Sequence, residues 1–188
     1  ELMGKISTEF KDPEGLFFPD TYLFAKGSSE IEIYRRAHQA MLDHLNAAWE
    51  KRNKELPYKT PYEALIMASI VEKETGQKSE RNMIAGVFVN RLRTGMLLQT
   101  DPTVIYGMGD RYQGKIRKVD LLTDTPYNTY TRAGLPPTPI ALPGAASLAA
   151  ALNPDKTEAL YFVARGDGTS HFSSNLNEHN QAVNRYQR

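Results

Sequence analysis

The fold is predicted from one helix-forming segment, Thr60-Pro61-Tyr62-Glu63-Ala64-Leu65-Ile66-Met67-Ala68-Ser69-Ile70-Val71-Glu72-Lys73-Glu74-Thr75-Gly76. Thr60 and Glu63 have the spacing of a capping box, and Pro61 stands at the first helical position. The stretch therefore predicts a helix that begins at Thr60, runs to about Thr75 and stops at Gly76.

This predicted helix ends in an unusual carboxyl group. At 100° per residue, Glu74 falls near the middle of an apolar stripe formed by Ile66, Met67, Ile70 and Val71. Glu72 points almost the opposite way and is interpreted as a surface charge. Desolvation at the end of an apolar face raises the pKa of a carboxyl group, which suits a general acid near neutral pH. The alternative is that Glu74 is a solvated residue, or the partner of a nearby Lys or Arg.

Outward from this helix, the sequence predicts a mostly helical α+β fold with a small β-hairpin and a long irregular middle loop. Residues 1–27 are expected to be an irregular linker whose aromatic run, Leu16 to Phe24, packs on a catalytic domain of residues 28–188. Further expected elements are a long helix capped by Ser28 or Ser29 and ending near Asn53, a helix over 80–93, a helix over 147–152 capped by Ser147, a hairpin over 159–173 and a terminal helix over 176–186.

Composition excludes several classes of function. The 188 residues contain 23 Lys and Arg against 22 Asp and Glu, so no bulk positive charge predicts nucleic-acid binding. Without Cys the chain has neither disulfides nor a Cys nucleophile, and its four His have no zinc-site spacing. No cofactor and no metal are therefore expected. No apolar run is long enough to span a membrane.

Residues 96–145 form the long irregular stretch, and such stretches are usually functional. Short helical pieces are expected near 102–106 and 119–122, with Asp101 as a helix N-cap. Aromatic faces beside amide and carboxylate groups suit sugar binding, which makes candidate substrate ligands of Gln99, Thr100, Asp101, Tyr127, Asn128 and Tyr130. An equally weighted alternative is a proline-stiffened loop whose tyrosines cover a core.

Several motifs together resemble one family, the MltG/YceG-like endolytic murein transglycosylases of bacteria. The resemblance covers nearly the whole chain and rests on residues 14–22, 68–75, 89–92, 98–106, 127–130 and 134–140. A fainter similarity links the chain to lysozyme-like soluble transglycosylases, in which a catalytic Glu ends a helix and a Tyr-Asn pair lines the cleft. Glu74-Thr75 and Tyr127-Asn128 correspond to these features and imply a lysozyme-like catalytic domain.

The resemblance implies that Glu74 is a single general acid/base that cleaves the β-1,4 bond between N-acetylmuramic acid (MurNAc) and N-acetylglucosamine (GlcNAc). The product would carry a 1,6-anhydro end. Implied partners are peptidoglycan glycan strands and peptidoglycan synthases (penicillin-binding proteins), with a role in limiting nascent strand length. The chain is then expected to be part of a longer protein, anchored through its N-terminus at the periplasmic face of the inner membrane. The alternatives are a muramidase that uses Asp101 as second carboxylate and a non-catalytic glycan-binding module.

Overall fold

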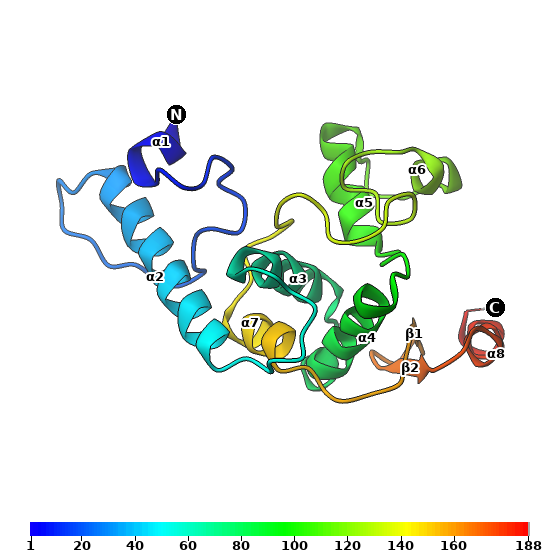
Figure 1. The fold of residues 1–188 in the computed structure, drawn as a ribbon. Coiled ribbons are helices and arrows are strands. Elements are labelled where there is room, and N and C mark those ends of the chain that lie inside the picture. Colours follow the sequence, from blue (N-terminus) through cyan, green and yellow to red (C-terminus); the bar gives the residue numbers. More distant parts are fainter. Residues whose placement is uncertain (188) are drawn as a thin grey trace.

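A computed structural model describes residues 1–187 and confirms the mostly helical α+β class (Figure 1). Its sheet consists of two antiparallel strands, in which Tyr161 pairs with Ser173 and Ala164 with Ser170. The elements in chain order are α1 (Leu2–Ile6), α2 (Glu30–Glu50), α3 (Pro61–Glu74), η1 (Lys78–Glu80), α4 (Arg81–Thr94), α5 (Asp101–Met108), η2 (Gly109–Arg111), α6 (Lys118–Leu122), α7 (Ala145–Leu152), β1 (Tyr161–Ala164), β2 (Ser170–Ser173) and α8 (Leu176–Tyr186). Within residues 1–187, no helix combines the length and apolarity needed to cross a membrane.

Helix α3 lies at the centre of the fold, in contact with α2, α4, α5 and α7 (Figure 1). Every residue from 64 to 71 is buried, so the helix is covered on all sides and not along a single stripe. An all-round apolar helix belongs in the core. The predicted stripe was therefore too narrow, because α7 and α4 cover faces that a lone helix would leave in water.

Both ends of α3 can be explained by local hydrogen bonds. The Thr60 hydroxyl accepts from the Glu63 amide at 3.2 Å, as predicted, but the Glu63 carboxylate accepts from the Lys59 amide. At the other end Thr75 is extended, and its amide and hydroxyl both donate to the Val71 carbonyl. The helix thus ends at Glu74, one residue before its predicted end near Thr75, and the residue that stops it is Thr75 rather than Gly76.

Glu72 is not the surface charge that the sequence predicted. Its Oε2 accepts hydrogen bonds from the Gly144 amide at 3.1 Å and from the Ser147 hydroxyl at 2.5 Å. Gly144, not Ser147, is the N-cap of α7, and it has no side chain with which to cap. Glu72 therefore caps α7 from 72 residues away, and a carboxylate also suits the positive end of a helix.

The N-terminal segment differs from the prediction in two ways. Residues 2–6 form helix α1, which packs on α2, where irregular chain was expected. Leu16 is fully buried and Phe17 and Phe18 pack on the core, but Leu23 and Phe24 are 83% and 64% exposed. Only the first part of the aromatic run therefore packs on the domain.

Other predicted elements are confirmed with small shifts. Ser29 caps α2 in a capping box, and the hairpin and α8 lie where the sequence placed them. Asp101, expected as the N-cap of α5, is the first helical residue, because Thr100 is the extended residue before it. Capping therefore does not account for the Asp101 side chain.

Replacing Glu72 by Ala should destabilise the protein by about 1–2 kcal/mol, because α7 loses its cap and Ser147 loses its acceptor. Urea unfolding followed by circular dichroism measures the change. Lys73→Ala, one residue away and exposed, is the matched control and should change stability little. Equal stability of the two variants would contradict this role of Glu72.

Candidate active site

Glu74 is held at the edge of the core by α3 and by one hydroxyl donor. The Thr100 hydroxyl donates to Glu74 Oε1 at 2.5 Å. Burial raises the pKa of the Glu74 carboxyl, the Thr100 hydrogen bond lowers it, and the negative charge of Asp101 raises it further. Burial is the largest of these effects, so the net pKa lies above the ordinary value for glutamate.

Thr100 is fixed by two further buried threonines. Its amide donates to the Thr129 hydroxyl at 3.0 Å, and its carbonyl accepts from the Thr103 hydroxyl at 2.8 Å. The Thr103 and Thr129 hydroxyls are also 2.8 Å apart, and all three residues are at most 2% exposed. This network joins the start of α5 to the loop of residues 125–131 and holds the donor against Glu74.

Gln99 immediately precedes this network and has a strained backbone. Its φ of 50° lies in the left-handed region, which residues other than Gly and Asn seldom adopt. Its amide donates to the Thr129 carbonyl at 3.1 Å, which helps to hold that conformation. Strain of this kind concentrates at functional sites, because only a surrounding structure that demands it maintains it.

Asp101 and Tyr130 form a second polar pair in the same region. The Tyr130 hydroxyl donates to Asp101 Oδ1 at 2.6 Å. Burial and the charges of Asp101 and Glu74 raise the pKa of Tyr130, so its hydroxyl stays protonated. The pair therefore offers one fixed hydroxyl and one free carboxylate oxygen beside Glu74.

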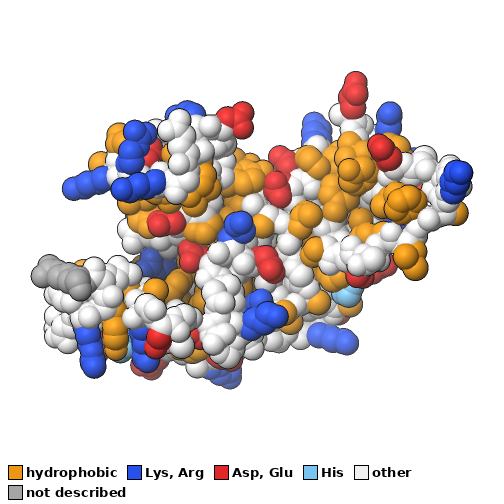
Figure 2. Space-filling model, turned by 180° about the vertical axis from the view of Figure 1, so that it is seen from behind, with side chains coloured by type: hydrophobic (Ala, Val, Ile, Leu, Met, Phe, Trp, Pro, Cys, Tyr) orange, Lys and Arg blue, Asp and Glu red, His pale blue; other side chains and the backbone are white. Residues whose placement is uncertain are grey.

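A hollow of about 680 Å³ brings these groups together. Glu74, Gln99, Asp101 and Tyr130 line one side, and β1 and α8 line the other. Seen from behind, the surface is notched between the part that contains α5 and α6 and the part that contains α8 (Figure 2). Four of the seven predicted site residues thus share one cleft, and Thr100 lies directly behind Glu74.

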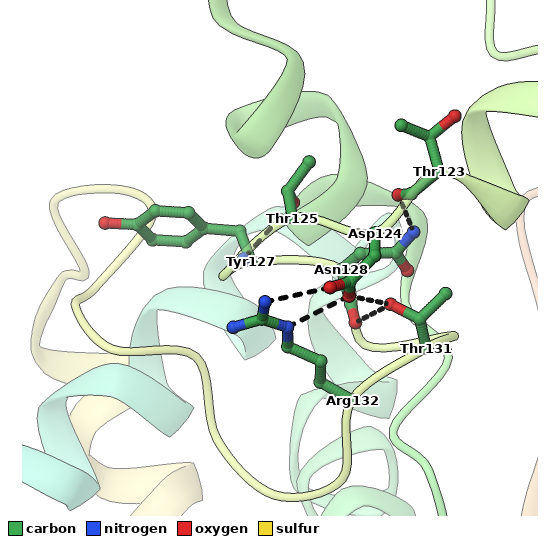
Figure 3. A network of polar contacts seen from close by, with 7 residues as sticks. All are labelled: Thr123, Asp124, Thr125, Tyr127, Asn128, Thr131 and Arg132. Atoms are coloured by element: carbon green, nitrogen blue, oxygen red, sulfur yellow. Dashed lines mark hydrogen bonds and ion pairs between the residues drawn. The ribbon is translucent and has the colours of Figure 1, made fainter.

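Tyr127 and Asn128 are not among the residues that line this hollow. Tyr127 packs on Tyr106 with ring centroids 4.7 Å apart, and its hydroxyl lies 2.8 Å from that of Thr138. Asn128 is completely buried, and its Nδ2 donates to the Leu121 carbonyl. It also donates to the Thr123 carbonyl (Figure 3). Asn128 is enclosed in its own loop in this structure, where its hydrogen bonds hold the loop in shape, and its contact with a substrate stays a prediction.

The loop around Asn128 is further fixed by an ion pair. Arg132 Nη2 and Asp124 Oδ2 are 2.8 Å apart, and the Thr131 hydroxyl donates to Asp124 Oδ1 (Figure 3). Arg132 and Thr131 lower the pKa of Asp124 to about 2. Asn128 Oδ1 accepts from the Tyr130 amide at 2.8 Å, so the loop positions Tyr130 in the cleft.

Sequence reasoning missed the residues of the opposite wall. Arg91, Tyr161, His179 and Asn180 line the same hollow as Glu74. Arg91 lies in one of the motifs of the resemblance, residues 89–92, but that motif did not assign it to the site. Tyr161, His179 and Asn180 lie outside these motifs, and the four residues meet only after folding. The one available signal was the strong polar face of the terminal helix.

A second hollow, of about 550 Å³, lies between the start of α3 and residues 134–137. Its carboxylate, Glu63, already accepts from the Lys59 amide, so it is engaged in the helix cap. Within residues 1–187, no group of three His, Asp or Glu side chains could hold a metal ion. The hollow around Glu74 is therefore the candidate active site.

Comparison with known proteins identifies the family of this chain. Residues 2–185 match the model of the YceG-like family, and the chain belongs to this family. An endolytic murein transglycosylase from Bacillus subtilis (strain 168) is 42% identical over 175 residues, covering 92% of this chain and 48% of that protein. Another, from Streptococcus pneumoniae (strain R6), is 35% identical over 182 residues, which cover 90% of this chain and 31% of that protein.

The fold is shared with a solved structure of the same family. A YceG-like protein from Listeria monocytogenes, solved by crystallography at 2.6 Å, superposes with a TM-score of 0.79 and 38% identity. The match covers 95% of this chain and 58% of that one. The chain thus spans about half or less of the length of the curated relatives that it matches.

Glu74→Gln should stabilise the fold at neutral pH. A raised folded-state pKa adds stability that is complete below the unfolded pKa and is lost as the pH rises through the folded pKa. At neutral pH the carboxyl therefore opposes folding, whereas the neutral amide does not. In urea unfolding at pH 7 the variant should have a higher free energy of unfolding than the parent chain. This difference should vanish at acid pH. Glu72→Gln is the matched control and should give no gain, and a less stable Glu74→Gln at pH 7 would contradict the assignment.

Proposed function

We propose that this domain is a lytic transglycosylase that cleaves the β-1,4 bond between MurNAc and GlcNAc inside peptidoglycan glycan strands. The observation that carries the proposal is the desolvated Glu74 carboxyl, which lines a hollow large enough for sugar rings and has a raised pKa. The printed names of the relatives, endolytic murein transglycosylases, support the substrate class. A carboxyl at the end of a buried helix beside a cleft also supports the lysozyme-like assignment.

In the first step of the proposed mechanism, protonated Glu74 acts as the general acid. Its proton passes to the glycosidic oxygen, and the bond from that oxygen to muramic C1 breaks. The GlcNAc hydroxyl leaves, and positive charge develops at C1. A raised pKa leaves a larger fraction of the Glu74 carboxyl protonated at a given pH than an ordinary glutamate would have, which suits a general acid.

In the second step the Glu74 carboxylate acts as the base. It takes the proton of the muramic C6 hydroxyl, whose oxygen attacks C1 and closes a 1,6-anhydro ring. Glu74 is then protonated again, so atoms and charges balance over the cycle. Because the nucleophile belongs to the substrate, one carboxyl group is enough, and the high effective concentration of that hydroxyl replaces an activated water.

Within this proposal Gln99, Asp101 and Tyr130 contact the glycan. The Tyr130 hydroxyl and the free Asp101 oxygen can bond sugar hydroxyls or acetamides. Thr100 orients Glu74, whereas Tyr127 and Asn128 support the loop that presents Tyr130. This divides the predicted site residues into contacting and supporting groups.

A hydrolase is the second candidate function, and one observation favours it. Asp101 lines the same hollow as Glu74 and is not used as a helix cap, so a second carboxylate is available. Asp101 would then activate a water or act as the nucleophile, and the product would have a reducing end. The Tyr130 hydroxyl already occupies Asp101 Oδ1, which leaves one carboxylate oxygen for a water, and this favours the transglycosylase.

The wider biological setting belongs to the proposal as well. Murein lies outside the cytoplasm, so an enzyme that cuts it works at the outer face of the inner membrane. We propose that the whole protein is anchored there through its N-terminus, works beside peptidoglycan synthases and limits the length of nascent strands. The longer relatives leave room for such segments.

Incubating uncrosslinked glycan strands with this chain should yield internal fragments with 1,6-anhydro ends, identified by mass spectrometry. Glu74→Gln should lower the rate at least about 100-fold, because general acid–base catalysis contributes about 10²–10⁴-fold. Glu72→Gln is the matched control, a carboxyl two residues away that faces α7, and should retain activity when folded. Reducing ends would instead support the hydrolase with Asp101. Unchanged cleavage by Glu74→Gln would contradict the catalytic role, and binding without cleavage by the parent would support a glycan-binding module.

A further inference from the structure

The hollow around Glu74 has a second wall whose task is unassigned. All four residues of β1 contribute to it, together with four residues of α8, Leu176, His179, Asn180 and Val183, and with Gln187, which follows α8. None of these side chains is a carboxylate, whereas the opposite wall contains Glu74 and Asp101. The two walls therefore differ in chemistry, and the wall of β1 and α8 is here called the far wall.

Stacked planar groups form the centre of the far wall. The Tyr161 and His179 rings stack with centroids 5.0 Å apart and an interplanar angle of 23°. The Arg91 guanidinium carbon lies 5.0 Å from the centroid of the same Tyr161 ring. Such a stack restrains the rotation of each group, so the far wall offers a fixed aromatic surface.

Arg91 fixes the far wall relative to the Glu74 wall. It is only 8% exposed, and its Nε donates to the Leu160 carbonyl at 2.6 Å, one residue before β1. Its Nη1 donates to the carbonyls of Leu97 and Leu98, three and two residues before Thr100. One buried side chain thus joins both walls, which keeps the width of the hollow constant.

The exposed chemistry of the far wall is polar but uncharged. Burial and the positive charge of Arg91 lower the pKa of His179, so its imidazole is neutral near pH 7. Asn180 adds an exposed amide one residue away. His179 Nδ1 is buried and has no hydrogen-bond partner within residues 1–187, so the wall holds an unsatisfied polar atom. Neutral hydrogen-bonding groups beside an aromatic face suit a sugar rather than a polyanion.

We propose that the far wall is a saccharide-binding subsite, in which His179 and Asn180 hold the glycan strand beside the bond that Glu74 cleaves. A sugar ring packs on the Tyr161–His179 surface, and its hydroxyl or acetamide groups bond the imidazole and the Asn180 amide. This inference rests on the proposed function, because it assigns residues to the same substrate. His179 and Asn180 are positioning residues and take no part in the proton transfers.

Binding without turnover tests the subsite. A peptide-free MurNAc–GlcNAc octasaccharide is titrated calorimetrically into the Glu74→Gln chain and into the same chain with His179→Ala or Asn180→Ala added. Each addition should weaken binding about fivefold to tenfold, the value of one good hydrogen bond. On the parent background each should raise KM and leave kcat nearly unchanged. His171→Ala, a histidine on β2 that does not line the hollow, is the matched control and should leave both unchanged.

His179→Phe separates loss of hydrogen bonding from misfolding, because it retains a ring against Tyr161 and removes both imidazole nitrogens. It should fold, melt close to the parent temperature and bind more weakly than the parent. Unchanged affinity in all three variants would overturn the subsite, even if Glu74→Gln had abolished cleavage and so supported the proposed function. No binding by the Glu74→Gln chain itself would overturn both the subsite and the proposed substrate.

Discussion

The arrangement of the other elements rests on the burial of the middle of helix α3. Residues 64–71 are covered on every side, so the helix cannot rotate or slide without opening the core. Its last residue, Glu74, is therefore delivered to a fixed place where the core meets a hollow. Burial disfavours the ionised carboxylate there and raises its pKa. The packing of an apolar helix thus changes the acidity of one carboxyl group.

The irregular segments are ordered because side chains replace the missing ladder of backbone hydrogen bonds. Thr100, Thr103 and Thr129 bind one another behind Glu74, and Asn128 satisfies two carbonyls of its own loop. Polar groups buried in irregular chain must find such partners, or the loop would not stay folded. A site made from loops can in this way be as rigid as one made from helices. The strained backbone of Gln99 also requires such a rigid surrounding.

The sequence predicted those features that depend on neighbours along the chain. The start of α3, the hairpin, the terminal helix and the unusual setting of Glu74 follow from local pattern and capping chemistry. Features that depend on distant partners were not predictable. Glu72 resembled a surface charge because its partners, Gly144 and Ser147, are more than 70 residues away. The far wall was missed for the same reason, since Arg91 reaches β1 across 69 residues.

The central claim is that the Glu74 carboxyl of the folded chain holds its proton to a higher pH than an ordinary glutamate. An NMR titration of the chain with ¹³C-labelled glutamate side chains tests it most directly, with Glu74→Gln identifying the resonance by its absence. We expect the pKa of Glu74 to lie above the ordinary value for a glutamate side chain in a peptide. A pKa at or below that value would contradict this assignment, because the hydrogen bond from Thr100 would then outweigh the burial of the carboxyl.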